Sequence, residues 1–228
     1  MTVRLSPAAR LGIVSDRRRL AAACGRALDE APALLLTQVD AAAEAGVGFF
    51  QLREPDLAAA ALATLARRLV SVAAGRTRIV VNDRADVAAV AGADLHLKHA
   101  SIDASRLRVW MAASTWMSRA VHTVADVAAA GPVDAVIAGT ATASRSKPLG
   151  WPTLGPAGLA ALVAASSAPV FAIGGLTPAD WRWVAGGGAF GVAAIGAFLP
   201  RPDEDAGAAV RRVVAAFISE IDCWEGRY

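Results

Sequence analysis

The chain has 228 residues, 55% of them hydrophobic, which is enough to build one large domain around a sizeable core. Its 23 basic and 20 acidic residues leave a net charge of +3, and this near balance argues against a nucleic-acid-binding surface. The two cysteines, Cys24 and Cys223, lack the spacing of a metal or redox motif. We therefore expect free thiols in a reducing compartment, the cytoplasm.

No membrane segment is expected. Arg4 and Arg10 interrupt the apolar residues at the start of the chain, so no cleavable signal is predicted. The uncharged stretch from 148 to 179 is long enough to mimic a membrane span. Its glycines, prolines and serines, however, divide it into a helix and a buried strand. The basic run at residues 17–19 (Arg-Arg-Arg) is expected to be a solvated loop.

Eight short apolar runs recur along the chain, each followed by helical or turn sequence, which is typical of buried parallel strands. The predicted strands are residues 11–16, 46–54, 77–83, 94–98, 116–122, 134–140, 169–175 and 190–196. The predicted helices are residues 34–45, 57–74, 84–91, 104–113, 124–130, 155–165, one that Thr177 caps with Pro178 at its first position, and 203–221.

Eight strand–helix units in a chain of this length predict an α/β fold, a (β/α)8 TIM barrel. We expect a single TIM-barrel domain over residues 1–228, with its strands and helices over about residues 11–221. A doubly wound open sheet is the alternative. That fold normally carries a glycine-rich first turn, and the sequence after the first predicted strand does not contain one.

The active site of such a barrel lies at the carboxyl ends of its strands. Gln51 and Arg53 stand two residues apart at the end of the second predicted strand, so they share one face. A buried strand that ends in two hydrogen-bond donors is suited to hold an anion. The other polar residues expected at this mouth are Asn82, Asp83, His96, Lys98, Arg119, His122 and a loop with Ser144, Ser146 and Lys147.

Glycines follow the seventh and eighth predicted strands. Gly174, Gly175 and the pair Ile195-Gly196 lie where TIM barrels often bind phosphate through backbone N–H groups beside helix N-termini. The alternative is that these glycines only permit tight turns. The loop with Ser144, Ser146 and Lys147 is predicted to close over the same phosphate, and its alternative is a solvated polar loop.

Five segments come in the order and spacing of one family. They are 50–54 (Phe-Gln-Leu-Arg-Glu), 81–87 (Val-Asn-Asp-Arg-Ala-Asp-Val), 91–97 (Ala-Gly-Ala-Asp-Leu-His-Leu), 121–123 (Val-His-Thr) and 172–175 (Ala-Ile-Gly-Gly). Over about residues 10–200 the chain resembles the thiamine phosphate synthase/TenI family, which implies a (β/α)8 barrel. Synthases of this family join a pyrimidine diphosphate to a phosphorylated thiazole carboxylate and use Mg²⁺. The TenI branch instead tautomerises the thiazole phosphate carboxylate.

Two departures favour the TenI branch. Pro55 stands where the synthase pattern has a lysine that helps to hold the diphosphate. Ser101 stands where the pattern has a second metal-binding aspartate, so Asp83 keeps one carboxylate of the pair. Losing a metal ligand and a cation together weakens the charge stabilisation that a diphosphate leaving group requires. Asp103 is the candidate replacement ligand, which keeps the synthase as an alternative.

Residues 119–123 (Arg-Ala-Val-His-Thr) resemble the Arg-Ser-Val-His-Ser run of the TenI branch. The expected function is therefore proton transfer on a phosphorylated thiazole carboxylate without a cofactor. His122 is the predicted acid/base, because its pKa near ~6.5 makes both protonation states accessible. The alternative is a strand-end histidine whose ring only binds a backbone carbonyl. Gln51 and Arg53 are expected to contact the carboxylate or the ring. His96 and His99 are expected to be structural.

The remaining predicted ligand contacts are Asn82, Arg119, Ser144, Ser146, Lys147, Gly174, Gly175, Ile195 and Gly196, with Asp83 as a Mg²⁺ ligand only in a synthase. The alternative for Asn82 and Asp83 is that they only brace the barrel mouth. A further alternative is a non-catalytic barrel that binds thiazole phosphate or thiamine phosphate. The expected partner is the small phosphorylated substrate, without nucleic acid or membrane. Trp181 and Trp183 lie on one short predicted helix, and an exposed surface there predicts a homodimer.

Overall fold

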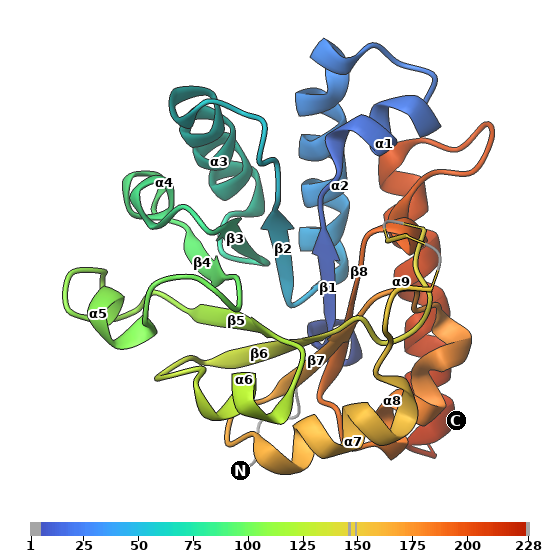
Figure 1. Ribbon diagram of the computed structural model, residues 1–228. Coiled ribbons are helices and arrows are strands. Elements are labelled where there is room, and N and C mark those ends of the chain that lie inside the picture. Colours follow the sequence, from blue (N-terminus) through green and yellow to red (C-terminus); the bar gives the residue numbers. More distant parts are fainter. Residues whose placement is uncertain (1–5, 146, 149, 227–228) are drawn as a thin grey trace.

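The computed structural model describes residues 6–145, 147–148 and 150–226. Eight parallel strands form a closed barrel in sequence order, and β8 pairs with β1 to complete it. Helices surround this barrel (Figure 1). The predicted TIM barrel is therefore confirmed, and the open doubly wound sheet is excluded.

All eight strands lie within their predicted ranges. They are β1 Leu11–Val14, β2 Phe49–Leu52, β3 Arg78–Asn82, β4 Asp94–Leu97, β5 Met117–Val121, β6 Ala135–Gly139, β7 Val170–Ile173 and β8 Gly191–Ala194. The prediction succeeded because each strand is largely buried on both faces, so its sequence is a nearly continuous apolar run.

The described α-helices are α1 Arg17–Ala23, α2 Ala31–Ala45, α3 Ala59–Ala73, α4 Ala85–Ala91, α5 Ala104–Arg108, α6 Val124–Ala128, α7 Gly155–Ala165, α8 Trp181–Gly186 and α9 Ala206–Trp224. Short 3-10 helices are η1 Pro7–Arg10, η2 Leu28–Glu30, η3 Pro178–Asp180 and η4 Gly196–Phe198. The helix after Thr177 therefore starts as η3 and continues as α8. The expected helix over 104–113 ends at Arg108, whose guanidinium donates to Pro132 O and Thr115 O.

The core has two layers. Inside the barrel, Phe49, Val80, Ile137 and Phe171 form one cluster. Between the strands and the helices lies a second and larger cluster, to which Leu95 and Leu97 of β4 belong. Because side chains alternate along a strand, residues two positions beyond an inner residue point into the barrel or toward its mouth. This alternation determines which polar residues at the strand ends point toward the mouth of the barrel.

The solvated loop expected at residues 17–19 is wrong. These residues begin α1, whose N-cap Asp16 accepts a hydrogen bond from Arg19 N at 3.1 Å. Arg17 is only 7% exposed, and its Nη1 donates to Glu54 Oε2 at 3.0 Å. Its Nη2 donates to Asp56 Oδ2 at 2.9 Å. Arg17 therefore connects the start of α1 to the loop after β2 through a buried and a partly buried ion pair.

The exposed tryptophan surface is also wrong for Trp181, the first residue of α8, whose side chain is fully buried. Trp183 packs partly against the outer core and donates from Nε1 to Asp180 Oδ1 at 3.0 Å. The homodimer stays a prediction without this support. The uncharged stretch from 148 to 179 forms α7 and β7, as expected. In the part of the chain that the structure describes, no helix combines the length and apolarity that a membrane span requires.

Candidate active site at the carboxyl ends of the strands

The end of β2 meets the end of β3 through an amide pair. Gln51 continues the inner face that begins with Phe49, and its Nε2 donates to Asn82 Oδ1 at 2.9 Å. Arg53 follows two residues later with an exposed side chain, while its backbone N donates to Ser15 Oγ at 2.9 Å. The structure thus brings Gln51 and Asn82 together inside the mouth and places Arg53 at the rim.

His96 lies on the inner face of β4, beneath the mouth. The imidazole is 5% exposed, and its Nδ1 is 2.9 Å from Ser118 Oγ on β5. Burial lowers the pKa of His96 to about 4, with a smaller opposing effect from Asp83. The ring is therefore uncharged at neutral pH and agrees with the structural role expected for it.

Asp83 follows β3 and is held from two sides. Lys98 Nζ lies 2.6 Å from Asp83 Oδ2, and the Ser101 hydroxyl donates to Asp83 Oδ1. Burial raises the pKa of Asp83, but the hydrogen bonds from Lys98 and Ser101 outweigh it and hold that pKa below its ordinary value. Asp83 is therefore an ionised carboxylate that already has a cation beside it.

The side chains around Asp83 do not fit Mg²⁺. This ion binds through one or two carboxylates together with substrate phosphates. Here the Ser101 hydroxyl donates its hydrogen bond to Asp83, and the second group beside Asp83 is the Lys98 ammonium, which repels a cation. Asp103, the candidate replacement, caps α5 by accepting from Ser105 N at 2.8 Å and Ser105 Oγ at 2.9 Å. Among the described residues, no three His, Cys, Asp or Glu side chains are grouped as metal ligands would be.

Two histidines, His99 and His122, lie side by side just beyond the carboxyl ends of β4 and β5. His122 continues the inner face after β5, and its Nδ1 is 2.5 Å from Gly139 O on β6. Because a carbonyl only accepts, Nδ1 carries the proton and Nε2 is the basic atom of the neutral ring. The ring of His99 lies at a centroid distance of 5.3 Å and an angle of 74°. The loop after β4 places His99, for which the sequence predicts a structural role, beside His122.

Arg119 is not brought into the group. Ser118 faces the barrel interior, so Arg119 points to the opposite face of β5. Its guanidinium donates to the carbonyls of His99, Ser101 and Ile102, and the residue is 5% exposed. Arg119 therefore holds the loop that carries His99 and Ser101, in place of the substrate contact predicted for it.

The glycines after β7 are required by close packing. Gly174 has a φ of +114° and Gly175 a φ of +69°, backbone angles that residues other than glycine rarely adopt. A Cβ on Gly175 would lie 2.2 Å from Ala143 O. Thr142 Oγ1 donates to Gly174 O at 3.0 Å. The loop after β6 therefore packs directly on this turn, which supports the tight-turn alternative and leaves the phosphate role a prediction.

Directly after β8, Ile195 packs against the inner cluster and precedes Gly196, the first residue of η4. The guanidinium Nη2 of Arg19 lies 3.5 Å from the position that a Cβ on Gly196 would occupy. Sequence reasoning missed this cation, because it treated residues 17–19 as a loop. Its presence beside the expected phosphate position is the strongest sign of an anion subsite at this edge.

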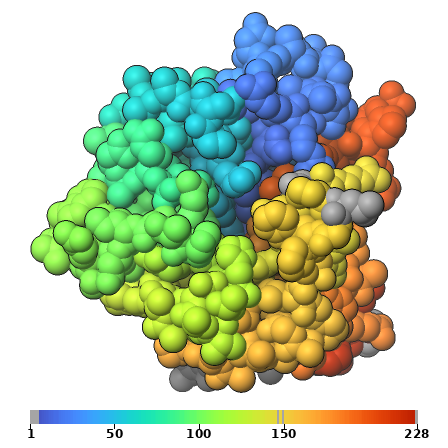
Figure 2. Space-filling model, viewed as in Figure 1, coloured from blue at the N-terminus to red at the C-terminus, as the bar shows by residue number. Residues whose placement is uncertain are grey.

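The loop after β6 carries the remaining predicted residues. Lys147 N donates to Ser144 O at 3.0 Å, and the Lys147 ammonium lies 4.3 Å from the centroid of the Trp151 ring. Ser146 lies outside the described residues. In the space-filling view the surface is hollowed near the centre of the face that this loop borders (Figure 2).

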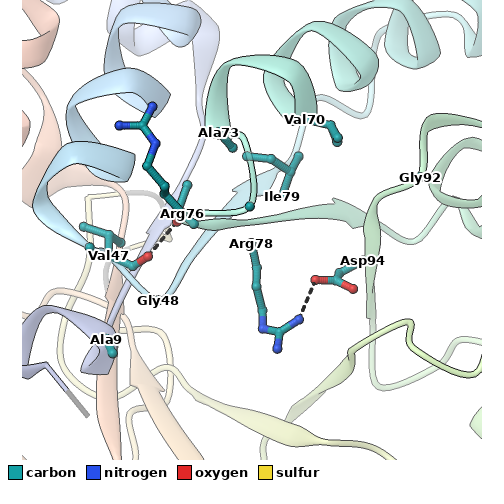
Figure 3. A pocket seen from close by; sticks show the side chains of 13 residues that line it. Ala9, Val47, Gly48, Val70, Ala73, Arg76, Arg78, Ile79, Gly92 and Asp94 are labelled. Atoms are coloured by element: carbon teal, nitrogen blue, oxygen red, sulfur yellow. Dashed lines mark hydrogen bonds and ion pairs between the residues drawn. The ribbon is translucent and has the colours of Figure 1, made fainter.

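A cavity of about 410 Å³ opens at the opposite, amino-terminal end of the strands (Figure 3). Its charged groups are paired, because Arg78 Nη1 binds Asp94 Oδ2 at 3.2 Å and Arg76 Nη2 lies 3.8 Å from Asp40 Oδ1. Asp94 also accepts from Trp116 N at 2.8 Å. This end is therefore built for stability, and the reactive groups gather at the mouth.

A comparison with family models matches residues 20–198 to the thiamine monophosphate synthase family. The chain belongs to this family. It is 39% identical over 185 residues to the thiamine-phosphate synthase of Anaeromyxobacter dehalogenans, covering 80% of this chain and 82% of that protein. It is 33% identical over 173 residues to the thiamine-phosphate synthase of Azorhizobium caulinodans, covering 74% and 82%.

Among solved structures, the thiamine phosphate pyrophosphorylase from Pyrococcus furiosus aligns over 97% of this chain and 99% of its own, with a TM-score of 0.76 and 21% identity. This similarity supports the barrel alone. The named relatives are synthases, so the family expected from the sequence is confirmed. Their names support the coupling activity given above as the alternative better than the TenI branch.

Proposed function

We propose that the chain is a thiamine-phosphate synthase, which joins a pyrimidine diphosphate to a phosphorylated thiazole. The observation that carries this proposal is its 39% identity, over four fifths of the chain, to a relative of that name. Both substrates are anionic, so the mouth must offer two separate positions for phosphate groups. The geometry of the mouth agrees with that requirement.

The two proposed anion subsites lie on opposite sides of the barrel. Strands follow in sequence order around it, so β3 and β4 lie across the mouth from β7 and β8. Arg53 and Lys98 supply positive charge at the first side. Arg19 lies beside Gly196 at the second. A site for one phosphorylated substrate would need only one of these sides.

The residues of the mouth then have distinct roles. The diphosphate binds beside Arg53 and Lys98, and the thiazole phosphate binds the backbone of Gly175 and Gly196 with Arg19. The amide pair of Gln51 and Asn82, joined at 2.9 Å, orients the rings between them. Neutralising the diphosphate as it leaves lowers the barrier, since its charge grows in the transition state.

A second candidate is the tautomerisation expected from the sequence. The observation that favours it is the pair of imidazoles, His99 and His122, at a centroid distance of 5.3 Å. One ring can accept a proton while the other donates one, which is what a tautomerase requires. Here the same thiazole phosphate would bind, but no second substrate would be needed.

The two reactions are separated by a product assay with two substrate arms. In the first, the protein receives the pyrimidine diphosphate and the aromatic thiazole phosphate carboxylate, with and without added Mg²⁺, and thiamine phosphate is quantified. In the second, the non-aromatic thiazole tautomer is given alone and followed to the aromatic form. Coupling predicts product in the first arm. Product only in the second arm, with a loss of about 10²-fold or more in His122→Ala, would overturn coupling in favour of tautomerisation.

A further inference from the structure

We propose that the Lys98 ammonium takes the place of a divalent cation beside Asp83 and contacts the diphosphate directly. This inference rests on the proposed function, because it names how that site neutralises one of its substrates. The family resemblance implies Mg²⁺ between two carboxylates, whereas this chain has a serine at the second position. The structure shows what fills the space.

The ends of β3 and β4 bring the three groups together. Asn82 pairs with His96 in the strand register, and Asp83 N donates to His96 O at 2.7 Å. Lys98 lies two residues after His96, so it continues the inner face of β4. Its Nζ reaches Asp83 Oδ2 at 2.6 Å. Lysine and aspartate therefore meet where the mouth opens.

Ser101 is committed to the same cluster. Its hydroxyl proton goes to Asp83 Oδ1, while its oxygen accepts from Lys98 N at 2.9 Å. A hydroxyl has one proton, and this one is used on Asp83. Ser101 therefore holds the loop after β4 against the aspartate. A cation that bound both residues would have to break these bonds and displace the ammonium.

An ammonium carries three donors, and Asp83 Oδ2 engages Lys98 Nζ from one side. The Lys98 side chain is 58% exposed, so the rest of the ammonium faces the solvent from which the substrate arrives. It can therefore donate to the carboxylate and to a phosphate oxygen at the same time. The same lysine supplies the positive charge that the synthase pattern places at Pro55.

Binding of inorganic pyrophosphate tests this role without turnover. Isothermal titration calorimetry in the presence of a chelator compares the wild-type protein with Lys98→Met and Lys98→Arg. Wild type should bind, Lys98→Met should bind at least ~10-fold more weakly, and Lys98→Arg should stay within about 3-fold of wild type. The matched control is Arg84→Ala, because Arg84 pairs with Asp86 at 2.6 Å and lies outside the cluster. Equal affinities of wild type and Lys98→Met would overturn the proposal.

Binding of Mn²⁺, followed by its electron paramagnetic resonance signal, tests the metal directly. Wild type should show no site that Asp83→Asn removes, whereas Lys98→Met/Ser101→Asp should gain one. A stoichiometric wild-type site lost in Asp83→Asn would contradict the proposal. Thermal unfolding confirms that each variant is folded. Neither readout requires product, so a failure of the coupling assay leaves both results interpretable.

Discussion

The buried His96 makes stability depend on pH, and a substitution isolates its contribution. Its folded pKa of about 4 lies below the ordinary value of 6.5, because burial disfavours the imidazolium. Between these values the unfolded chain binds more protons than the folded chain, so stability is full above pH 6.5 and is lost as pH falls toward 4. From pH 7 to pH 5 this one group should cost about 2 kcal/mol of the free energy of unfolding.

Urea unfolding at pH 7 and pH 5 measures this cost in the wild type, in His96→Gln and in Ser118→Ala. Glutamine does not titrate, so the pH-dependent loss of stability should be about 2 kcal/mol smaller in His96→Gln than in wild type. Ser118→Ala removes the partner at 2.9 Å but keeps the buried ring, so it should retain the wild-type pH dependence. If His96→Gln loses as much stability as wild type, the account of an uncharged, buried His96 is refuted.

Three other substitutions test the structure at single points. Gly175→Ala places a Cβ 2.2 Å from Ala143 O at a φ of +69°, and chemical unfolding should show a loss of about 2 kcal/mol or more. Gly186→Ala, whose Cβ would meet only Trp224 at 3.7 Å, is its control and should cost nothing. Arg17→Met leaves buried Glu54 without its cation, and the same measurement should show a loss of about 3 kcal/mol; a loss below about 1 kcal/mol would contradict this role of Arg17. Arg19→Ala should raise the KM for the thiazole phosphate about 10-fold with little change in kcat, and an unchanged KM would remove Arg19 from the phosphate subsite.

The barrel could be predicted because each strand is a continuous apolar run, a signal that local sequence carries. Helix α1 could not, since the partners that bury Arg17 are Glu54 and Asp56, almost forty positions away along the chain. The run of three arginines therefore looked like a solvated loop. Helix α5 ends at Arg108, earlier than predicted. The contacts of Arg108 are with residues 115 and 132, which the local sequence pattern does not show.

The strand ends predicted that Gln51, Asn82 and His96 lie at one end of the barrel, but they did not give the direction of every side chain. Side chains alternate along β5, and Val121 belongs to the outer core, so Arg119 lies on the outer face and not in the mouth where it was predicted. The pairing of His99 with His122 depends on how the loop after β4 folds back, which no local pattern shows. The same holds for the ion pair of Lys98 with Asp83, which joins the ends of two neighbouring strands.

Formation of thiamine phosphate tests the central claim most directly. The purified protein is given the pyrimidine diphosphate and the aromatic thiazole phosphate carboxylate, and product is quantified as each concentration is varied. The account predicts product that requires both substrates, with a rate that saturates in each and one diphosphate released per thiamine phosphate. No product, while the Anaeromyxobacter dehalogenans relative forms it under the same conditions, would contradict the account.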